Sequence, residues 1–159
     1  MREEISFGAA VLRDLQGEGV PLSAIIRRIL EWPPVRQSLP LRKRLGWELE
    51  GFPEEEEALV RELGRVVKRA GLWEPFFASV EELERFIRIK EGETKRMEAT
   101  PEPGSIFIGG FRPEFLEDEE EVESTKAYLH RLRRFLAEVI VERYFILTNR
   151  FIKHFDWML

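Results

Sequence analysis

The chain has 159 residues, of which 43% are hydrophobic and 35% are charged, and its formal net charge is −5. This composition is typical of a soluble globular protein and excludes a disordered or collagen-like chain. The chain has no cysteine, which excludes disulfides, thiolate zinc sites and thiol nucleophiles. Its length suits one domain, or at most two small ones.

The expected compartment follows from the apolar segments. The N-terminal stretch MREEISFGAA has acids where a signal peptide needs a basic and then an apolar run. Residues 135–147 are the most apolar stretch, but Glu138, Glu142 and Arg143 interrupt it, so it is a poor membrane span. We therefore expect a cytoplasmic protein with no membrane partner. Twelve Phe against two Tyr, with abundant Glu and Arg, indicate a thermophilic source.

Apolar spacing predicts two helices before the first proline pair. The apolar face of the first helix consists of Ile5, Ala9, Leu12 and Leu15. Ser23 is expected to cap the second helix. Pro33 and Pro34 are expected to end it, because proline cannot continue the helical hydrogen-bond ladder. The apolar face of this second helix consists of Ile25, Ile26, Ile29 and Leu30.

A third helix is expected from about residue 39 onward. Its apolar stripe consists of Leu41, Leu45, Leu49 and Phe52. Gly51 can adopt the left-handed conformation that closes a helix, and Pro53 prevents its continuation. Helix termination therefore accounts for Gly51 and Pro53, but it does not require Trp47 or Glu48.

Two further helices are predicted in the middle of the chain. Four glutamates at 54–57 suit the N-terminal end of a fourth helix, because the helix dipole favours negative charge there. The core face of that helix consists of Leu59, Leu63, Val66, Val67 and Ala70, with Gly71 closing it. A fifth helix opens at Ser79, because Glu82 three residues later completes a capping box. Its buried face consists of Leu83, Phe86 and Ile87.

The rest of the chain is predicted to be a loop followed by one long helix. Residues 91–113 are rich in Gly and Pro, and a short strand or hairpin is expected near 105–109. The long helix runs from about 118 to 156, with acids at its start and bases at its end. Its apolar stripe consists of Leu129, Leu132, Leu136, Ile140, Leu147, Phe151, Phe155 and Met158.

These elements predict an all-α fold, a bundle of about five shorter helices and one long C-terminal helix. We expect an N-terminal helical region at 1–90, a loop or hinge at 91–113 and the long helix at 114–159, together forming one compact domain. The long helix is apolar over so wide an arc that we expect a second copy of the chain to cover it, unless the shorter helices do so. The expected homo-oligomer interface consists of Tyr144, Leu147, Phe151, Phe155, Trp157 and Met158.

The charges are distributed unevenly along the chain. Residues 25–45 hold six bases against one acid, whereas residues 114–123 hold seven acids and no base. Such patches either form separate solvated faces or pair, within the fold or between copies. The bases that could contact a nucleic-acid backbone are Arg27, Arg28, Arg42, Lys43 and Arg44. A helix-turn-helix is not predicted, because the connection EWPPVRQSLP is too long for its turn.

No metal site or nucleotide loop is predicted. His130 and His154 have no carboxylate three or four residues away, so neither forms a helical metal pair. The glycines of GSIFIGGF, residues 104–111, lack the Lys-Ser/Thr ending of a phosphate-binding loop. We therefore expect no cofactor and no metal.

One pair of carboxylates is a candidate for a catalytic site. Glu138 and Glu142 lie one helical turn apart, and paired carboxylates can act as acid and base. Arg134 lies four residues before Glu138, and Arg143 follows Glu142 directly, which favours a solvated or salt-bridged stripe. We assign no catalytic residue, and the sequence favours a protein that is not an enzyme.

The first third of the chain resembles a known family. LRDLQGEGVPLSAIIRRIL and, after a gap, LRKRLGWELEGFP resemble the AbiTii domain, a small helical domain associated with bacterial abortive infection and anti-phage defence. The residues that carry the resemblance are Leu22, Ser23, Ile25 to Leu30, Trp47, Glu48, Leu49, Gly51, Phe52 and Pro53. The family often has Asn before the glycine and Tyr after it, where this chain has Glu50 and Phe52.

The resemblance covers residues 9–53 and implies a function rather than a catalytic site. It implies a non-catalytic interaction or oligomerisation module of an anti-phage system, with another protein of that system as a partner. Trp47, Glu48 and Phe52 are the expected binding corner. The alternative function is nucleic-acid binding by the basic cluster within 27–44, although the overall acidity of the chain disfavours a polyanion partner.

Overall fold

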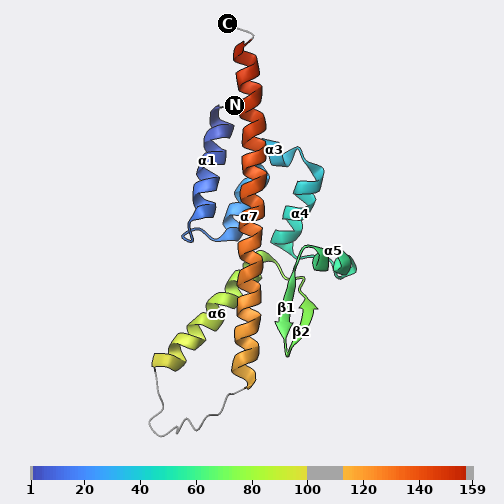
Figure 1. Cartoon of the computed structure of the whole chain (residues 1–159), viewed down its shortest axis with the longest axis vertical. Coiled ribbons are helices and arrows are strands. Elements are labelled where there is room, and N and C mark those ends of the chain that lie inside the picture. The colour runs from blue at the N-terminus through green and yellow to red at the C-terminus, as the bar shows by residue number, and fades with distance from the viewer. Residues whose placement is uncertain (1, 100–112, 157–159) are drawn as a thin grey trace. The chain divides into compact units, whose positions relative to one another are not determined.

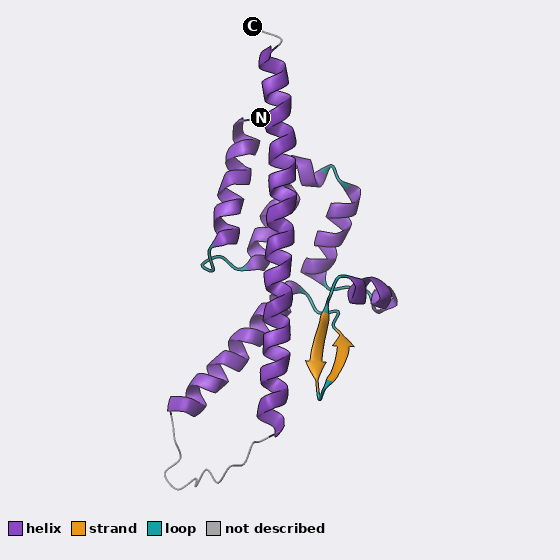
Figure 2. Cartoon of the chain, viewed as in Figure 1, coloured by secondary structure: helices purple, strands orange, loops and turns teal. Residues whose placement is uncertain are grey.

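The computed structural model describes the backbone of residues 2–99 and 113–156 and the side chains of residues 2–93 and 119–143. Over these ranges the chain is mainly α-helical, with a small antiparallel sheet (Figure 2). The elements are α1 (Arg2–Gln16), α2 (Leu22–Glu31), α3 (Pro33–Arg36), α4 (Leu39–Glu50), the 3-10 turn η1 (Glu54–Glu56), α5 (Glu57–Glu62), β1 (Val66–Arg69), β2 (Leu72–Pro75), α6 (Val80–Ala99) and α7 (Pro113–Asp156). The predicted helical class with a long C-terminal helix is confirmed.

These elements form two compact units, and α7 contributes to both of them (Figure 1). The first unit comprises Met1–Glu50 and His130–Leu159, and the second comprises Gly51–Leu129. This division differs from the expected one at 1–90, 91–113 and 114–159. A helix reads as one element in the sequence, but the two ends of α7 pack in different units.

The core of the first unit is aliphatic and centres on α2. This helix packs against α1, α3 and α4, and the burial of Ile25, Ile26 and Ile29 confirms most of its predicted face. The other buried apolar side chains described in this unit are Val11, Leu15, Leu22, Trp32, Val35, Leu45, Leu132, Leu136, Val139 and Ile140. Arg133 on α7 holds the loop after α1, because its guanidinium donates to the carbonyl oxygens of Gly17 (3.0 Å) and Val20 (3.3 Å).

Two local expectations for the first unit are wrong. α1 buries Gly8, Val11 and Leu15, whereas the predicted Ala9 is exposed. A count of apolar side chains misses a buried glycine, because glycine has no side chain to count. Ser23 lies inside α2 and is buried, because the helix begins at Leu22 and Pro21 occupies its N-cap position.

The proline pair after α2 begins an unpredicted helix. Pro33 and Pro34 occupy the first positions of the short α3, where their missing N–H groups would have no partner in any case. The two prolines therefore end one helix, as expected, and start the next.

The junction after α4 confirms the role predicted for Gly51. This residue has φ = 99°, a left-handed conformation that favours glycine. The next backbone N–H, from Phe52, donates to the carbonyl oxygen of Phe77 over 2.8 Å. A Cβ on Gly51 would lie 3.1 Å from that same oxygen, so the close approach also requires glycine.

The second unit overturns the predicted fourth helix. α5 ends at Glu62, Gly64 adopts φ = 75°, and Val66–Arg69 form a strand instead of a continued helix. The turn between β1 and β2 is Ala70 and Gly71, with φ values of 48° and 78°. Two positive φ values in a two-residue loop indicate a type I′ turn, which matches the twist of a hairpin.

The hairpin is tied to α7 through β1. The register pairs Val66 with Pro75 and Arg69 with Leu72. The N–H of Lys68 points away from β2 and donates to Ser124 Oγ over 3.2 Å. Lys68 and Arg69 also form ion pairs with two acids of α7, at 3.3 Å with Glu120 and at 2.6 Å with Glu121. Part of the acidic stretch at 114–123 therefore pairs within the fold.

The capping box at the start of α6 is confirmed. The backbone N–H of Ser79 donates to Glu82 Oε2 over 2.8 Å, and the N–H of Glu82 donates to Ser79 Oγ over 3.2 Å. The bond from the Ser79 backbone to the carboxylate lowers the pKa of Glu82 below its ordinary value. Val80 and Leu83 are buried on this helix, while Phe86 and Ile87 are half-buried.

Candidate functional site

The expected binding corner is largely buried. Glu48 is fully buried, and Phe52 is 5% exposed with the Arg65 guanidinium 4.5 Å above its ring. Trp47 is half-buried, and Lys43 Nζ lies 4.7 Å from the centre of its ring. Of the three residues of the expected corner, Trp47 alone is partly accessible, and its contact with a partner stays a prediction.

Arg65 forms a polar centre that the sequence did not reveal. Its Nε donates to the hydroxyl of Tyr128, and its Nη1 donates to the carbonyl oxygens of Phe76 and Ala78, each over 3.0 Å. The guanidinium also lies 4.7 Å from the ring of Phe76 and 4.9 Å from that of Tyr128. Arginine stays charged in proteins, so these acceptors and ring faces stabilise a cation inside the unit.

This centre is structural rather than catalytic. Arg65 and Tyr128 are both almost fully buried, so neither can reach a substrate. Together they connect the segment after β2 to α7. The sequence signal for this centre was Arg65 directly before Val66 and Val67. The predicted fourth helix would have placed Arg65 on a solvated face, so its burial was not predicted.

The basic cluster is divided by contacts within the first unit. Arg28 pairs with Asp14 and lies over the ring of Phe7, and Arg44 stacks on Phe135 at 3.9 Å. Arg27 and Arg42 are exposed. Of the five predicted polyanion contacts, Arg28, Lys43 and Arg44 thus contact the chain itself, and the structure does not present all five as one open surface.

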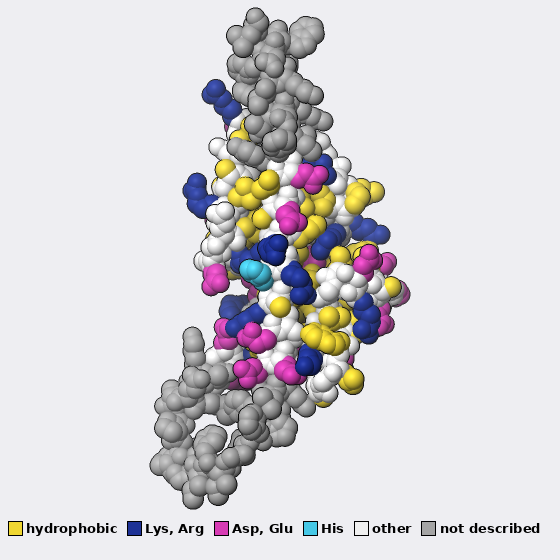
Figure 3. All heavy atoms as spheres, in the orientation of Figure 1, with side chains coloured by type: hydrophobic (Ala, Val, Ile, Leu, Met, Phe, Trp, Pro, Cys, Tyr) yellow, Lys and Arg dark blue, Asp and Glu magenta, His cyan; other side chains and the backbone are white. Residues whose placement is uncertain are grey.

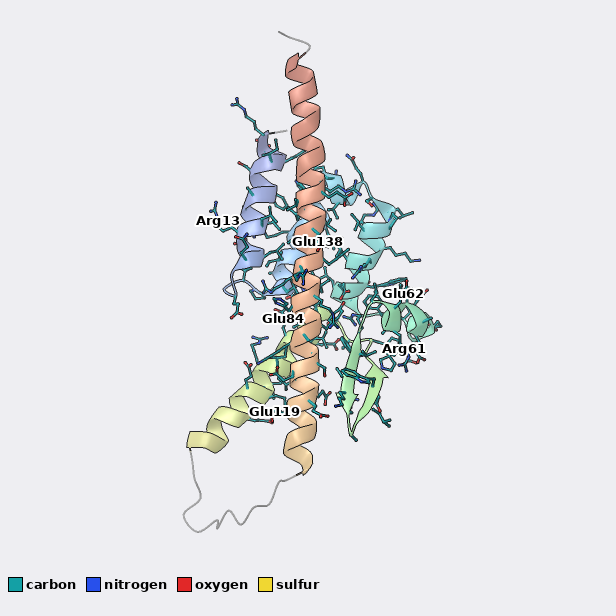
Figure 4. All side chains as sticks on the ribbon, in the orientation of Figure 1. Arg13, Arg61, Glu62, Glu84, Glu119 and Glu138 are labelled. Atoms are coloured by element: carbon teal, nitrogen blue, oxygen red, sulfur yellow. The ribbon has the colours of Figure 1, made fainter. Side chains whose placement is uncertain are left out.

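The carboxylate pair on α7 lies in solvent. Glu138 and Glu142 are exposed, as is the neighbouring Arg134 (Figure 4 labels Glu138). His130 is exposed as well. Exposed carboxylates beside a base are typical of a solvated helix surface. Among the residues that are described, no group of three His, Asp or Glu side chains could hold a metal ion.

Several large apolar side chains remain exposed on the described surface. Leu39 is 66% exposed on α4, and Leu72 and Trp73 on β2 are 67% and 55% exposed. Ile89 on α6 and Val141 on α7 are each about half exposed. Isolated exposed apolar residues are ordinary, and Leu72 and Trp73, as consecutive residues of a strand, point to opposite faces of the hairpin.

Some predictions fall on residues that the structure does not describe. The backbone of 144–156 is helical, but the side chains of Tyr144, Leu147, Phe151 and Phe155 lie outside the described set. Trp157 and Met158, and the strand expected near 105–109, also lie outside it. The oligomer interface therefore stays a prediction.

Comparisons with protein-family models, with curated proteins and with solved structures gave no match. The likeness of residues 9–53 to the AbiTii domain therefore stays an expectation drawn from the residues themselves. In the ranges that the structure describes, no helix combines the length and the apolar character needed to cross a bilayer.

Proposed function

We propose that this chain is a non-catalytic interaction module that assembles through the C-terminal end of α7. The observation that carries the proposal is the packing register of α7. Leu132, Leu136 and Ile140 are buried at intervals of four residues, and they form part of the core of the first unit. This register shows which side of the helix the chain uses for packing.

The sequence continues the same apolar register beyond the described side chains. Tyr144, Leu147, Phe151 and Phe155 follow Ile140 at intervals of four, three, four and four residues. The backbone remains helical to Asp156, so this spacing keeps the apolar positions on one side. Two copies that pair these helices would share a single apolar seam.

The assembly test is a mass measurement in solution across a range of concentrations. The wild-type chain is expected to be a dimer or larger, and Phe151→Asp with Phe155→Asp is expected to be a monomer with unchanged helical content. Glu138→Gln with Glu142→Gln is the matched control, because these residues are exposed on the same helix and should not alter the mass. A wild-type monomer at every concentration would contradict the proposal.

We also propose that the module serves a bacterial anti-phage system. Support comes from the AbiTii-like pattern at 9–53, in which Gly51 adopts the left-handed conformation that its position after a helix requires. The test is plaque formation on bacteria that express the chain together with its genomic neighbours. Fewer plaques than on cells with an empty vector are expected. Equal plaque numbers across a broad phage panel would argue against a defence role.

Nucleic-acid binding remains the second candidate. The exposed Arg27, Arg42 and Lys43 favour it, whereas the internal contacts of Arg28 and Arg44 reduce the charge that is open to a phosphate backbone. Binding of this kind would weaken steeply with salt, because neutralised phosphates release counterions. Titration with labelled duplex DNA and RNA at two salt concentrations decides this candidate.

A further inference from the structure

One face of α4 carries positive charge around an exposed leucine. Leu39 is 66% exposed, and Arg42 and Lys43 follow it by three and four residues, which places them on the same side of the helix. Arg36, at the end of α3, is exposed as well. Figure 3 shows yellow and dark blue side chains side by side at the right-hand edge, where Figure 1 places α4. We call Arg36, Leu39, Arg42 and Lys43 the basic face.

Gly46 has no side chain, so the backbone of α4 is accessible beside the basic face. It lies inside α4, three residues after Lys43, where glycine is less favourable for the helix than alanine. A Cβ at this position would meet no atom within 4 Å. Packing within the chain therefore does not require glycine here, whereas a partner that approaches the helix backbone benefits from it.

The segment that follows α4 carries the opposite charge. Residues 48–57 contain six acids and no base, whereas residues 32–47 contain four bases and no acid. Glu54 and Glu55 in η1 and Glu62 in α5 are exposed. Figure 3 shows magenta side chains around α5, on which Figure 4 labels Glu62. We call Glu54, Glu55 and Glu62 the acidic corner.

These charges differ from the other charged clusters in having no ion pair with the side chains that the structure describes. Among the described side chains, no ion pair involves Arg36, Arg42, Lys43, Glu54 or Glu55. By contrast, the acids of α7 at Glu120 and Glu121 pair with the hairpin. Two exposed surfaces of opposite sign, each without a counter-charge among the described side chains, can pair with one another between two molecules.

We infer that the basic face of one copy docks on the acidic corner of a second copy. Leu39 supplies an apolar anchor, and the charges around it orient the two molecules and exclude wrong arrangements. The contact does not depend on the proposed seam at the end of α7. Association through the basic face is expected to depend on salt, whereas association through the apolar α7 seam is not.

The first experiment follows the mass of the full-length wild-type chain at low and high salt. Association through the basic face should raise the mass at 50 mM salt and disappear at 500 mM, because salt screens the charges. Arg36→Glu with Arg42→Glu should abolish this salt-sensitive step, and Leu39→Ala should weaken it without lowering the melting temperature. Arg85→Glu with Arg88→Glu, which changes the charge equally on exposed positions of α6, should leave the step intact.

The decisive experiment is a charge exchange between two variants. Glu54→Lys with Glu55→Lys should lose the salt-sensitive step on its own, as should Arg36→Glu with Arg42→Glu. In the equimolar mixture, the unaltered basic face of one variant meets the unaltered acidic corner of the other, so the salt-sensitive association should return as a complex of the two variants. A chain that carries all four reversals restores opposite signs between copies, so it should associate as the wild type does.

Three results would overturn the inference. They are a mass that does not change with salt, a salt-sensitive step that survives either double reversal, and failure of the fourfold reversal while circular dichroism shows a folded chain. Salt-sensitive binding of duplex DNA by the wild type, lost in Arg36→Glu with Arg42→Glu, would assign the basic face to nucleic acid instead. Loss of assembly only in the Phe151 and Phe155 variant would support the α7 seam and reject this second contact.

Discussion

The first unit and the second unit bury different chemistry at their centres. The first is built from aliphatic side chains such as Ile25, Ile26 and Leu136, whose contacts have little directional preference. The second surrounds the charged Arg65 with carbonyl oxygens, a hydroxyl and aromatic rings at defined distances. An aliphatic core stabilises the fold in proportion to the apolar surface area that it buries. A buried cation stabilises only the arrangement in which each of its hydrogen-bond donors has an acceptor.

The largest expected effect is the removal of the buried cation. Arg65→Met should destabilise the second unit by about 4 kcal/mol, because it leaves two carbonyl oxygens and the Tyr128 hydroxyl without their donor. Urea unfolding measures the loss, and amide exchange should localise it to β1 and β2. Arg65→Lys keeps the charge but lacks the planar fork, so it should recover only part of the stability. A wild-type midpoint for Arg65→Met would refute the assigned role.

A cavity in the aliphatic core is expected to cost less. Leu136 is fully buried on α7, and Leu136→Ala should destabilise the first unit by about 3 kcal/mol through lost burial and the space left behind. Amide exchange should increase in α2 and α4 more than in the hairpin. Equal increases in both units would show that they unfold together, and the comparison between them would then lose its energetic meaning.

The glycine after α4 is the next test. Gly51→Ala should cost about 2 kcal/mol, because alanine at φ = 99° is strained and its Cβ would lie 3.1 Å from the Phe77 carbonyl oxygen. Gly46→Ala is the matched control, since nothing lies within 4 Å of a Cβ there and alanine favours the helix. Thermal unfolding compares the two variants, which should shift the melting temperature in opposite directions.

The capping box gives the smallest effect and a dependence on pH. Ser79→Ala should cost about 1 kcal/mol at pH 7, because the Glu82 N–H loses its acceptor. The pKa of Glu82 is lowered in the folded state, so its contribution is complete above the ordinary glutamate pKa and is lost as the pH falls through the lowered value. The free energy of unfolding of Glu82→Gln should therefore be lower than that of the wild type at pH 7, and the two values should converge at acidic pH. A difference in unfolding free energy that stays constant with pH would contradict the hydrogen bond from the Ser79 N–H to the Glu82 carboxylate.

The sequence predicted the first unit better than the second, for a physical reason. The buried residues of α2 and α7 repeat at intervals of three or four, and side-chain hydrophobicity alone specifies that pattern. The capping box and the left-handed Gly51 were predicted because each rests on contacts between residues close in sequence. The buried Gly8 escaped prediction because it has no side chain to count.

The second unit depends on contacts that are distant in sequence. Val66 and Val67 fit a helical stripe, and the turn at Ala70 and Gly71 lacks the Asn or Asp that usually marks a type I′ hairpin. Arg65 donates one of its buried hydrogen bonds to Tyr128, 63 residues later in the chain. Of the expected binding corner, Trp47 alone stays partly accessible, since periodicity does not reveal which polar residues a neighbouring element will cover.

The hairpin edges have a consequence for the behaviour of the protein at high concentration. Stacking of exposed strands into fibrils needs a row of free backbone donors and acceptors. On β1 the Lys68 N–H already donates to Ser124. On β2 the N–H of Phe76 points to β1, so the alternation of the strand turns the nitrogen of Pro75 outward, and proline has no hydrogen to donate. The N–H of Trp73, two residues before Pro75, still faces outward by the same alternation, so these features shorten the row of free donors on the hairpin without removing it.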